Sequence, residues 1–316
     1  MIFQKLINLY FNPKINFKIF LCFFYFFLTF SCVENSRNIK LKPQIVCTTG
    51  MISDGVQAIV GEKMEVITLM RPGIDPHLYR PTPSTLKAID QADVIVHNGL
   101  HLEGNLVKVF ERLTNFKQIF AISEGIDPEN YLRLGDWNQN FDPHIWMHIP
   151  LWLQGLEGFL HFISTFDPSH RDFYHQNFVI YQKKLIDLHQ ENQTKLNMIP
   201  ESQRILITTH DAFAYFSKAY QIPVQALQGI STQSDFGVKK VQNLIQFILK
   251  NNIKAIFVES TVPQKAFHNI QEACQKEGHF LKIAGPLYTD ALGVEEANTY
   301  YEMLKFNTDL IVQALQ

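Results

Sequence analysis

Residues 168–199 read PSHRDFYHQNFVIYQKKLIDLHQENQTKLNMI and contain nothing that would interrupt a helix after the opening proline. Asp167 can cap the free amides at the start, Pro168 suits the first helical position, and Pro200 is a stop signal at the far end. The apolar positions roughly follow helical spacing; they are Phe173, Phe178, Ile180, Tyr181, Leu185, Leu188 and Leu196. These 32 residues, at about 1.5 Å each, give a rod of about 48 Å, long enough to run the height of two small lobes.

Short β-rich runs alternate with amphipathic stretches on both sides of this segment, which is typical of βα units around parallel sheets. The strands predicted before it are Gln44–Thr48, Met64–Met70, Val94–His97 and Gln118–Ala121. The strands predicted after it are Arg204–Thr208, Val224–Leu227, Ala255–Val258 and Phe280–Ile283. We therefore predict an α/β fold of two βα lobes, each with a four-stranded parallel sheet, joined by one long backbone α-helix.

The predicted boundaries follow from this pattern. They are an N-terminal lobe over 44–166, a linking helix over 167–200 and a C-terminal lobe over 201–316. A Gly/Ser linker would let two lobes swing widely, whereas a continuous helix resists bending unless Pro or Gly kinks it. We therefore expect only a small motion between the lobes.

The N-terminal residues differ in character from the rest of the chain. Three lysines precede an uncharged run over Ile19–Phe30, which ends at Ser31 and Cys32. This order is typical of a secretory signal. The run has 12 residues, whereas a helix that spans a membrane needs roughly 20. We predict a signal peptide over 1–31 and a polar tether over 32–43.

The segment 28–32 reads LTFSC and resembles the lipobox of bacterial lipoproteins, in which the Cys is acylated and becomes the mature N-terminus. Thr29 stands where the lipobox normally has leucine. Acylation of Cys32, simple cleavage and an uncleaved anchor therefore all stay open. In each case the protein would face the outside of the inner membrane, and a lipid on Cys32 is its only expected membrane contact. Cys47 and Cys274 lack a C-x-x-C spacing and are expected to pack as small apolar residues.

Composition restricts the class of protein. The chain has 316 residues, of which 46% are hydrophobic, and it has no long polar tract, so a packed globular body is expected. Its 28 basic and 30 acidic residues give a formal charge of −2, and no cluster of Lys and Arg could neutralise a run of phosphates. We therefore expect no nucleic-acid partner, and we expect the chain to act as a monomer.

Candidate metal ligands follow four of the predicted strands. His77 comes after the second strand of the first half, and His144 lies about twenty residues beyond the fourth. His210 follows the first strand of the second half, and Asp290 follows its fourth. In open α/β sheets ligands bind beyond the carboxyl ends of the strands, so these four side chains can face one cleft.

Three imidazoles and one carboxylate suit a borderline divalent ion such as Zn²⁺, and Mn²⁺ would accept the same set, especially with a bidentate carboxylate. Both His77 and His144 stand in Asp-Pro-His triplets. Proline fixes its own φ and pushes the preceding residue toward extended geometry, so each His follows a stiffened backbone. Asp75 and Asp142 can also accept hydrogen bonds from nearby amides. The sequence therefore predicts a preset metal site.

Most of the 12 histidines cannot be ligands. Solvated positions in or beside the long helical segment are expected for His161, His170, His175 and His189. His148 lies four residues after His144 and on a helix would share its face; we expect a supporting or surface position for it and leave its role open. Asp290 could instead cap the C-terminal helix, in which case Glu259 is the reserve carboxylate.

Over nearly its whole mature length the sequence resembles the zinc/manganese-binding solute-binding proteins of ABC transporters. The motifs that carry the resemblance are Pro72–His77, Asp93, Asn98-Gly99, Leu102-Glu103, Asp142–Trp146, Thr209–Phe216, Leu227–Ser231 and Asp290–Gly293. The resemblance implies two βα lobes, a linking backbone helix, a buried metal at their interface and delivery to a membrane permease. It also implies that His77, His144, His210 and Asp290 are the ligands.

The sequence departs from the family at two places. Where the family commonly continues His-x-Trp-x-Asp-Pro, this chain has His148 in place of the acid. Many zinc members carry a His-rich insertion before the second ligand, and residues 127–141 contain no His. Manganese-dedicated members, however, tend to have Glu at the third ligand, where this chain has His210. Both ions stay open, with zinc favoured.

We predict high-affinity capture of one Zn²⁺ or Mn²⁺ ion outside the inner membrane and delivery to an ABC permease, without catalysis. The first alternative is a zinc-dependent hydrolase, whose metal keeps three protein ligands plus water. Here a fourth ligand is available, and the sequence has no His-Glu-x-x-His and no Gly-x-Ser-x-Gly motif. The second is an organic-solute receptor or a surface adhesin on the same plan, in which the histidines would be incidental.

Overall fold

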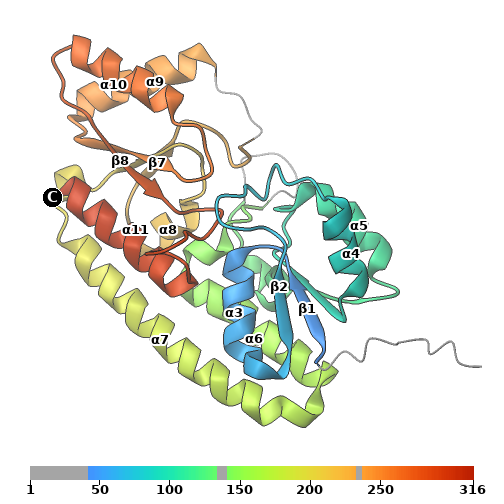
Figure 1. Cartoon of the computed structure of the whole chain (residues 1–316). Helices are drawn as coiled ribbons and strands as arrows, with labels where there is room; N and C mark the ends of the chain where they lie inside the picture. Colours follow the sequence, from blue (N-terminus) through green and yellow to red (C-terminus); the bar gives the residue numbers. More distant parts are fainter. Residues whose placement is uncertain (1–41, 134–140, 233–236) are drawn as a thin grey trace, which may run out of the picture. The chain divides into compact units, whose positions relative to one another are not determined.

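A computed structural model of the chain describes residues 42–133, 141–232 and 237–316 (Figure 1). The predicted signal peptide, Cys32 and all of the predicted tether except residues 42 and 43 lie outside the described residues. Across the described ranges, no helix has both the length and the apolar character required to cross a bilayer.

Two four-stranded parallel sheets form the framework, and the second repeats the strand order of the first. The first has the order β2-β1-β3-β4, with β1 Gln44–Cys47, β2 Glu65–Thr68, β3 Val94–His97 and β4 Gln118–Ala121. The second has the order β6-β5-β7-β8, with β5 Leu206–Thr208, β6 Val224–Ala226, β7 Ala255–Glu259 and β8 Lys282–Leu287. The predicted fold class is confirmed. Because all strands are parallel, their carboxyl ends in each sheet lie at one edge.

The last strand differs most from its predicted bounds. β8 begins at Lys282 rather than Phe280, whose side chain is 86% exposed ahead of the strand. It then continues through Pro286 to Leu287 instead of ending at Ile283. A proline is tolerated there because β8 is an edge strand. The longer strand brings the chain to within three residues of Asp290.

Helices cover both faces of the first sheet. Successive residues of a strand point to opposite faces, and Val46 of β1 packs in one cluster with residues of α4 (Pro83–Gln91) and α5 (Gly104–Leu113). Ile45 and Cys47 belong to the cluster on the other face, with α3 (Gly50–Val60) and α6 (Ile149–Phe166).

The second sheet is built in the same way. Ile207 of β5 packs in one cluster with residues of α9 (Val238–Asn251) and α10 (Lys265–Lys276). Leu206 belongs to the cluster that includes α8 (Ala214–Tyr220) and α11 (Tyr300–Leu315). Cys47 and Cys274 are buried free thiols in these clusters, as predicted.

The predicted linking helix is α7, which runs over Arg171–Asn197 and packs against α3, α6 and α11 (Figure 1). It begins later than predicted, because Pro168–His170 forms a 3₁₀ turn. Asp167 does not cap this turn; its carboxylate accepts hydrogen bonds from Ser169, His170 and Tyr174 instead.

The buried face of α7 differs in part from the predicted apolar positions. Phe178, Tyr181, Leu185, Leu188 and Leu196 are buried as the spacing predicts. Ile180 is 70% exposed, because it lies off that stripe, whereas Tyr174 and Asn192 complete the stripe and are buried.

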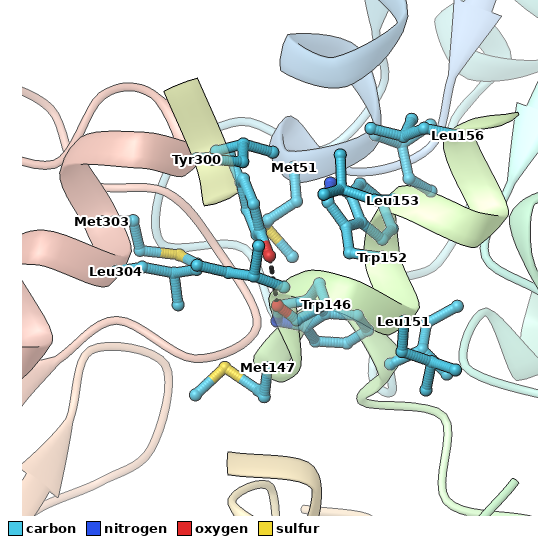
Figure 2. Close-up of a cluster of buried hydrophobic side chains, with 14 of the residues drawn as sticks. Met51, Trp146, Met147, Leu151, Trp152, Leu153, Leu156, Tyr300, Met303 and Leu304 are labelled. Carbon is cyan, nitrogen blue, oxygen red and sulfur yellow. Dashed lines mark hydrogen bonds between the residues drawn. The ribbon is translucent and has the colours of Figure 1, made fainter. Parts of the chain in front are cut away.

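A single hydrophobic cluster extends from the first sheet through α6 and α7 to the second sheet. Figure 2 shows its centre, where Met51 of α3, Trp146, Trp152 of α6 and Tyr300 of α11 lie together. All four side chains are at most 1% exposed. Close-packed interiors resist deformation, so this shared core supports the prediction of a small motion between the lobes.

Candidate metal site

The structure brings together the four predicted ligands, which come from four distant segments. His77 lies in the loop after β2, and His144 directly precedes the 3₁₀ turn Ile145–Met147. His210 follows β5 by two residues, and Asp290 follows β8. All four are buried, with exposed fractions of 6% for His77, 1% for Asp290 and 0% for the other two.

The Nε2 atoms of the three imidazoles converge on the Asp290 carboxylate. Oδ2 of Asp290 lies 3.2 Å from Nε2 of His210 and 3.8 Å from Nε2 of His77, and Oδ1 lies 3.5 Å from Nε2 of His144. The Nε2 atoms of His77 and His144 are 3.4 Å apart. One atom from each of the four residues can be chosen so that all lie within 4.8 Å of one another.

These separations have the dimensions of a metal coordination shell. In a tetrahedral zinc site with bonds of about 2.0–2.1 Å, neighbouring donor atoms are about 3.4 Å apart. The distances between 3.2 and 3.8 Å around Asp290 bracket this value. Within the described ranges, no other set of three or more His, Cys, Asp or Glu residues offers a comparable group. A dication would therefore fit here without a large rearrangement.

Carboxylates fix the backbone of all three histidines. Oδ1 of Asp75 accepts a hydrogen bond from the amide of His77 at 2.8 Å, and Oδ1 of Asp142 accepts one from the amide of His144 at 2.9 Å. The amide of His210 donates to Oε1 of Glu259 at 2.9 Å. The first two bonds confirm the prediction made from the Asp-Pro-His triplets.

Two of the same carboxylates also set the imidazole tautomers. Nδ1 of His144 lies 2.7 Å from Oδ1 of Asp142, and Nδ1 of His210 lies 2.5 Å from Oε2 of Glu259. A proton held on Nδ1 by a carboxylate leaves the Nε2 lone pair free for a metal and makes it more basic. Glu259, predicted only as a reserve ligand, therefore supports His210 rather than replacing Asp290.

Burial and neighbouring charges shift the pKa values of His77, His210 and Asp290. Burial lowers the pKa of His77 to about 4, so this imidazole is neutral at pH 7. Burial also lowers the pKa of His210, but the charges of Glu259 and Asp290 outweigh it and hold that pKa well above its ordinary value. Burial raises the pKa of Asp290, yet the interaction with His210 and the other imidazoles keeps it well below its ordinary value. Without metal, His210 is therefore protonated on both ring nitrogens at pH 7, and its positive charge lies between the carboxylates of Glu259 and Asp290.

A buried hydrogen-bond network positions the backbone before His144. Nδ2 of Asn98 donates to the carbonyl of Pro143 at 2.9 Å. Glu103 accepts hydrogen bonds from the Asn98 amide at 2.8 Å and from the Thr48 hydroxyl at 2.6 Å. Gly99 has a φ of 83°, and a Cβ there would lie 2.1 Å from Oγ of Ser123, so only glycine fits. Asn98, Gly99 and Glu103 of the two motifs thus support the candidate site without joining it.

The remaining candidate residues lie elsewhere. His148 does not share a helix face with His144, because a 3₁₀ turn separates them; its Nδ1 accepts a hydrogen bond from Leu151 N and caps α6. His161 and His175 are exposed as expected. His189 is half-buried against Tyr220 rather than solvated, because Tyr220 of α8 packs against that part of α7. Asp290 does not cap α11, since Thr299 does.

Sequence reasoning missed two hydrogen bonds between the lobes at this site. Nε1 of Trp146 donates to the carbonyl of Thr289 at 2.7 Å, and the hydroxyl of Thr232 donates to Oδ2 of Asp75 at 2.6 Å. The residues of each pair are 143 and 157 positions apart in the chain. No local pattern marks such pairs, and only the position of Trp146 beside His144 could have suggested one.

Comparison with known proteins places the chain in a family. Residues 45–314 match the family described as ZnuA, zinc-uptake complex component A, periplasmic. The manganese-binding lipoprotein MntA of Bacillus subtilis is 38% identical over 275 residues, which cover 86% of this chain and 90% of that protein. The zinc-binding protein TroA of Treponema pallidum is 37% identical over 276 residues, which cover 87% and 89%. The solved structure of periplasmic zinc-binding TroA superposes with a TM-score of 0.83, at 37% identity, and covers 87% of this chain and 99% of that one. This chain is therefore a member of the ZnuA family of periplasmic zinc-uptake components.

Proposed function

We propose that this protein captures one divalent transition-metal ion, with His77, His144, His210 and Asp290 as its ligands. The observation that carries the proposal is the convergence of three Nε2 atoms on one buried carboxylate, from four segments of two lobes. Buried polar groups of this kind are costly unless they are paired. A dication supplies the shared partner for all four donors.

Family membership supports a role in metal uptake outside the cytoplasm. The relatives include a manganese-binding lipoprotein and a periplasmic zinc-binding protein. The protein hands its ion to an ABC permease, acts as a monomer, and is held at the membrane by a lipid on Cys32. The lipid on Cys32 is proposed from the sequence alone, because residues 1–41 lie outside the described part of the chain.

The donor set favours Zn²⁺ over Mn²⁺. Imidazole ligands suit zinc, whereas manganese prefers oxygen ligands and a larger coordination number, and at a common site zinc binds more tightly by the Irving–Williams order. Both oxygens of Asp290 face imidazole nitrogens, so a bidentate carboxylate could still accommodate Mn²⁺. We therefore propose tighter binding of zinc, with manganese as a second ligand.

The same geometry favours transport over catalysis. Catalytic zinc sites keep three protein ligands and an open position for water, whereas closed sites have four protein ligands. Here four protein donors are available, and His77, the most exposed, has only 6% of its surface accessible. A donor cluster within 4.8 Å also leaves no room for an organic solute between these side chains.

The test is metal binding by the full chain, stripped of metal and then titrated with Zn²⁺ and Mn²⁺ in competition with a chelator. We expect one ion per chain, tighter binding of zinc, and loss of binding in His210→Ala. His175→Ala is the matched control, because His175 is exposed on α7. Equal binding by both variants would reject the ligand set, and hydrolysis of esters or peptides by the zinc-loaded protein would favour an enzyme.

A further inference from the structure

Trp146 joins the ligands of the two lobes. It lies in the 3₁₀ turn Ile145–Met147, two residues after His144, and its side chain is 1% exposed. Its indole Nε1 donates a 2.7 Å hydrogen bond to the carbonyl of Thr289, the residue directly before Asp290. A single bond therefore connects the segment that carries His144 to the segment that carries Asp290.

The connection continues to the third histidine. The hydroxyl of Thr289 donates to Oε2 of Glu259 at 2.9 Å, and the same oxygen lies 2.5 Å from Nδ1 of His210. A series of buried contacts thus runs from Trp146 through Thr289 and Glu259 to His210. The series includes none of the four donor atoms. Its members adjoin or contact three of the ligands, namely His144, Asp290 and His210.

Trp146 is itself held by one contact at its backbone carbonyl and another at its indole ring. The hydroxyl of Tyr300 donates to the Trp146 carbonyl at 2.7 Å, as the dashed line in Figure 2 shows. The indole and the His144 imidazole meet edge to face, with their ring centroids 5.3 Å apart and an interplanar angle of 64°. The indole therefore has a fixed position relative to His144. Its hydrogen bond to the Thr289 carbonyl in turn fixes the position of Thr289 relative to His144.

We infer that Trp146 is a positioning residue for the metal site, whose indole N–H holds the His144 and Asp290 donors at coordination distance across the lobe interface. The inference rests on the proposed function. Oδ1 of Asp290 and Nε2 of His144 are 3.5 Å apart, and small displacements of either segment would change that distance. Donors that are preset in this way spare the ion the cost of ordering them.

The chain offers a matched control in Trp152, six residues further on. Trp152 is 0% exposed and belongs to the same cluster, in which its ring lies 5.5 Å from that of Tyr300 (Figure 2). Its Nε1 has no hydrogen-bond partner among the described residues. Trp→Phe removes the same atoms at either position, but only Trp146→Phe breaks a link between ligands.

The experiment compares wild type, Trp146→Phe and Trp152→Phe as metal-free full chains. Zinc affinity and the zinc dissociation rate are measured by chelator competition, and visible spectra of the Co²⁺-loaded proteins report the geometry of the ligands. Loss of a partner that orients metal ligands typically weakens binding by about 10- to 100-fold. We expect at least about tenfold weaker zinc binding, faster dissociation and an altered Co²⁺ spectrum for Trp146→Phe, with Trp152→Phe within about twofold of wild type.

Equal affinities and identical Co²⁺ spectra for the two variants would overturn the inference. If Trp146→Phe does not fold, as judged by circular dichroism of the metal-free protein, the decision passes to Tyr300→Phe, which removes only the hydroxyl that holds the Trp146 carbonyl. Weaker zinc binding with a changed Co²⁺ spectrum then supports the inference, and wild-type values overturn it. Failure of wild type itself to bind either ion would instead reject the proposed function.

Discussion

The carboxylate of Glu259 and the imidazole of His210 form a buried pair, in which Oε2 lies 2.5 Å from Nδ1 and both side chains are 0% exposed. Glu259 ends β7, and His210 follows the neighbouring strand β5. The sheet therefore sets the distance between the two side chains. The pairing fixes the orientation of the imidazole and makes Nε2, the nitrogen proposed to bind the metal, more basic.

Glu259→Gln should weaken zinc binding by about 10- to 100-fold, because the amide keeps the size of the side chain but not its charge. The pKa of His210 should fall as well, since Glu259 raises it. Chelator competition measures the affinity. Glu272→Gln, at an exposed position of α10, is the control, and similar affinities for the two variants would contradict the role of Glu259.

Zinc binding should release about one proton at pH 7, because the imidazolium of His210 must become neutral to bind the metal. The pKa of His77 is lowered to about 4, so this imidazole is already neutral at pH 7 and contributes nothing to the release. Titration calorimetry in buffers of different ionisation enthalpy measures the release. Zinc affinity should fall as the pH is lowered, and an observed enthalpy independent of the buffer would argue against a protonated His210.

The stability of the metal-free protein should change with pH in the opposite direction to zinc affinity, and should fall as the pH rises. The pKa of His210 is raised in the folded state, so its contribution is fully present below its ordinary value near 6.5 and is lost as the pH rises toward the raised value. Urea unfolding of the metal-free chain between pH 6 and 9 tests this. The Glu259→Gln variant should show a weaker dependence on pH in that window.

Thr232→Val should speed zinc dissociation about two- to tenfold, which corresponds to the loss of one ordinary hydrogen bond. The hydroxyl of Thr232 contacts Asp75, whose other oxygen holds the His77 amide, so the bond ties the most exposed ligand to the C-terminal lobe. Stopped-flow mixing with a chelator measures the rate. Thr165→Val, at an exposed site of α6, should leave it unchanged; an equal effect in both variants would refute the link.

His148→Ala should cost about 1 kcal/mol of stability and leave zinc affinity unchanged, because His148 caps α6 and is not among the proposed ligands. His148→Asp should restore the cap. Burial lowers the pKa of His148 to about 4, so the wild-type cap is fully stabilising above its ordinary value of 6.5 and is lost as the pH falls through about 4. Urea unfolding of the metal-free chain tests both points, and a large loss of zinc affinity in His148→Ala would show that His148 belongs to the site.

Gly158→Ala should destabilise the fold by about 1–3 kcal/mol through overpacking. A Cβ at Gly158 would lie 2.4 Å from Cα of Gly125, where α6 crosses the turn after β4. Gly104→Ala is the control, because nothing lies within 4 Å of a Cβ at that position of α5. Thermal unfolding distinguishes the two, and equal melting temperatures would show that the contact can relax.

The sequence by itself determined the architecture and the set of candidate ligands. Alternation of β-rich and amphipathic runs depends on local hydrophobic spacing, so it predicted both parallel sheets, and an uninterrupted helical stretch predicted α7. Proline geometry in the Asp-Pro-His triplets is also local, and it predicted the Asp75 and Asp142 bonds. Element ends were predicted less well, as at β8, because an edge strand tolerates Pro286 and only the sheet decides which strand is at the edge.

The tertiary structure alone decided how the four donors are held. The bond from Trp146 to Thr289, the bond from Thr232 to Asp75 and the support of His210 by Glu259 join residues from 49 to 157 positions apart. Such contacts depend on how the two sheets and their helices pack, which no spacing along the chain encodes. Local patterns could therefore name the candidate ligands, but the distances that bring these side chains together arise only when the lobes share one core.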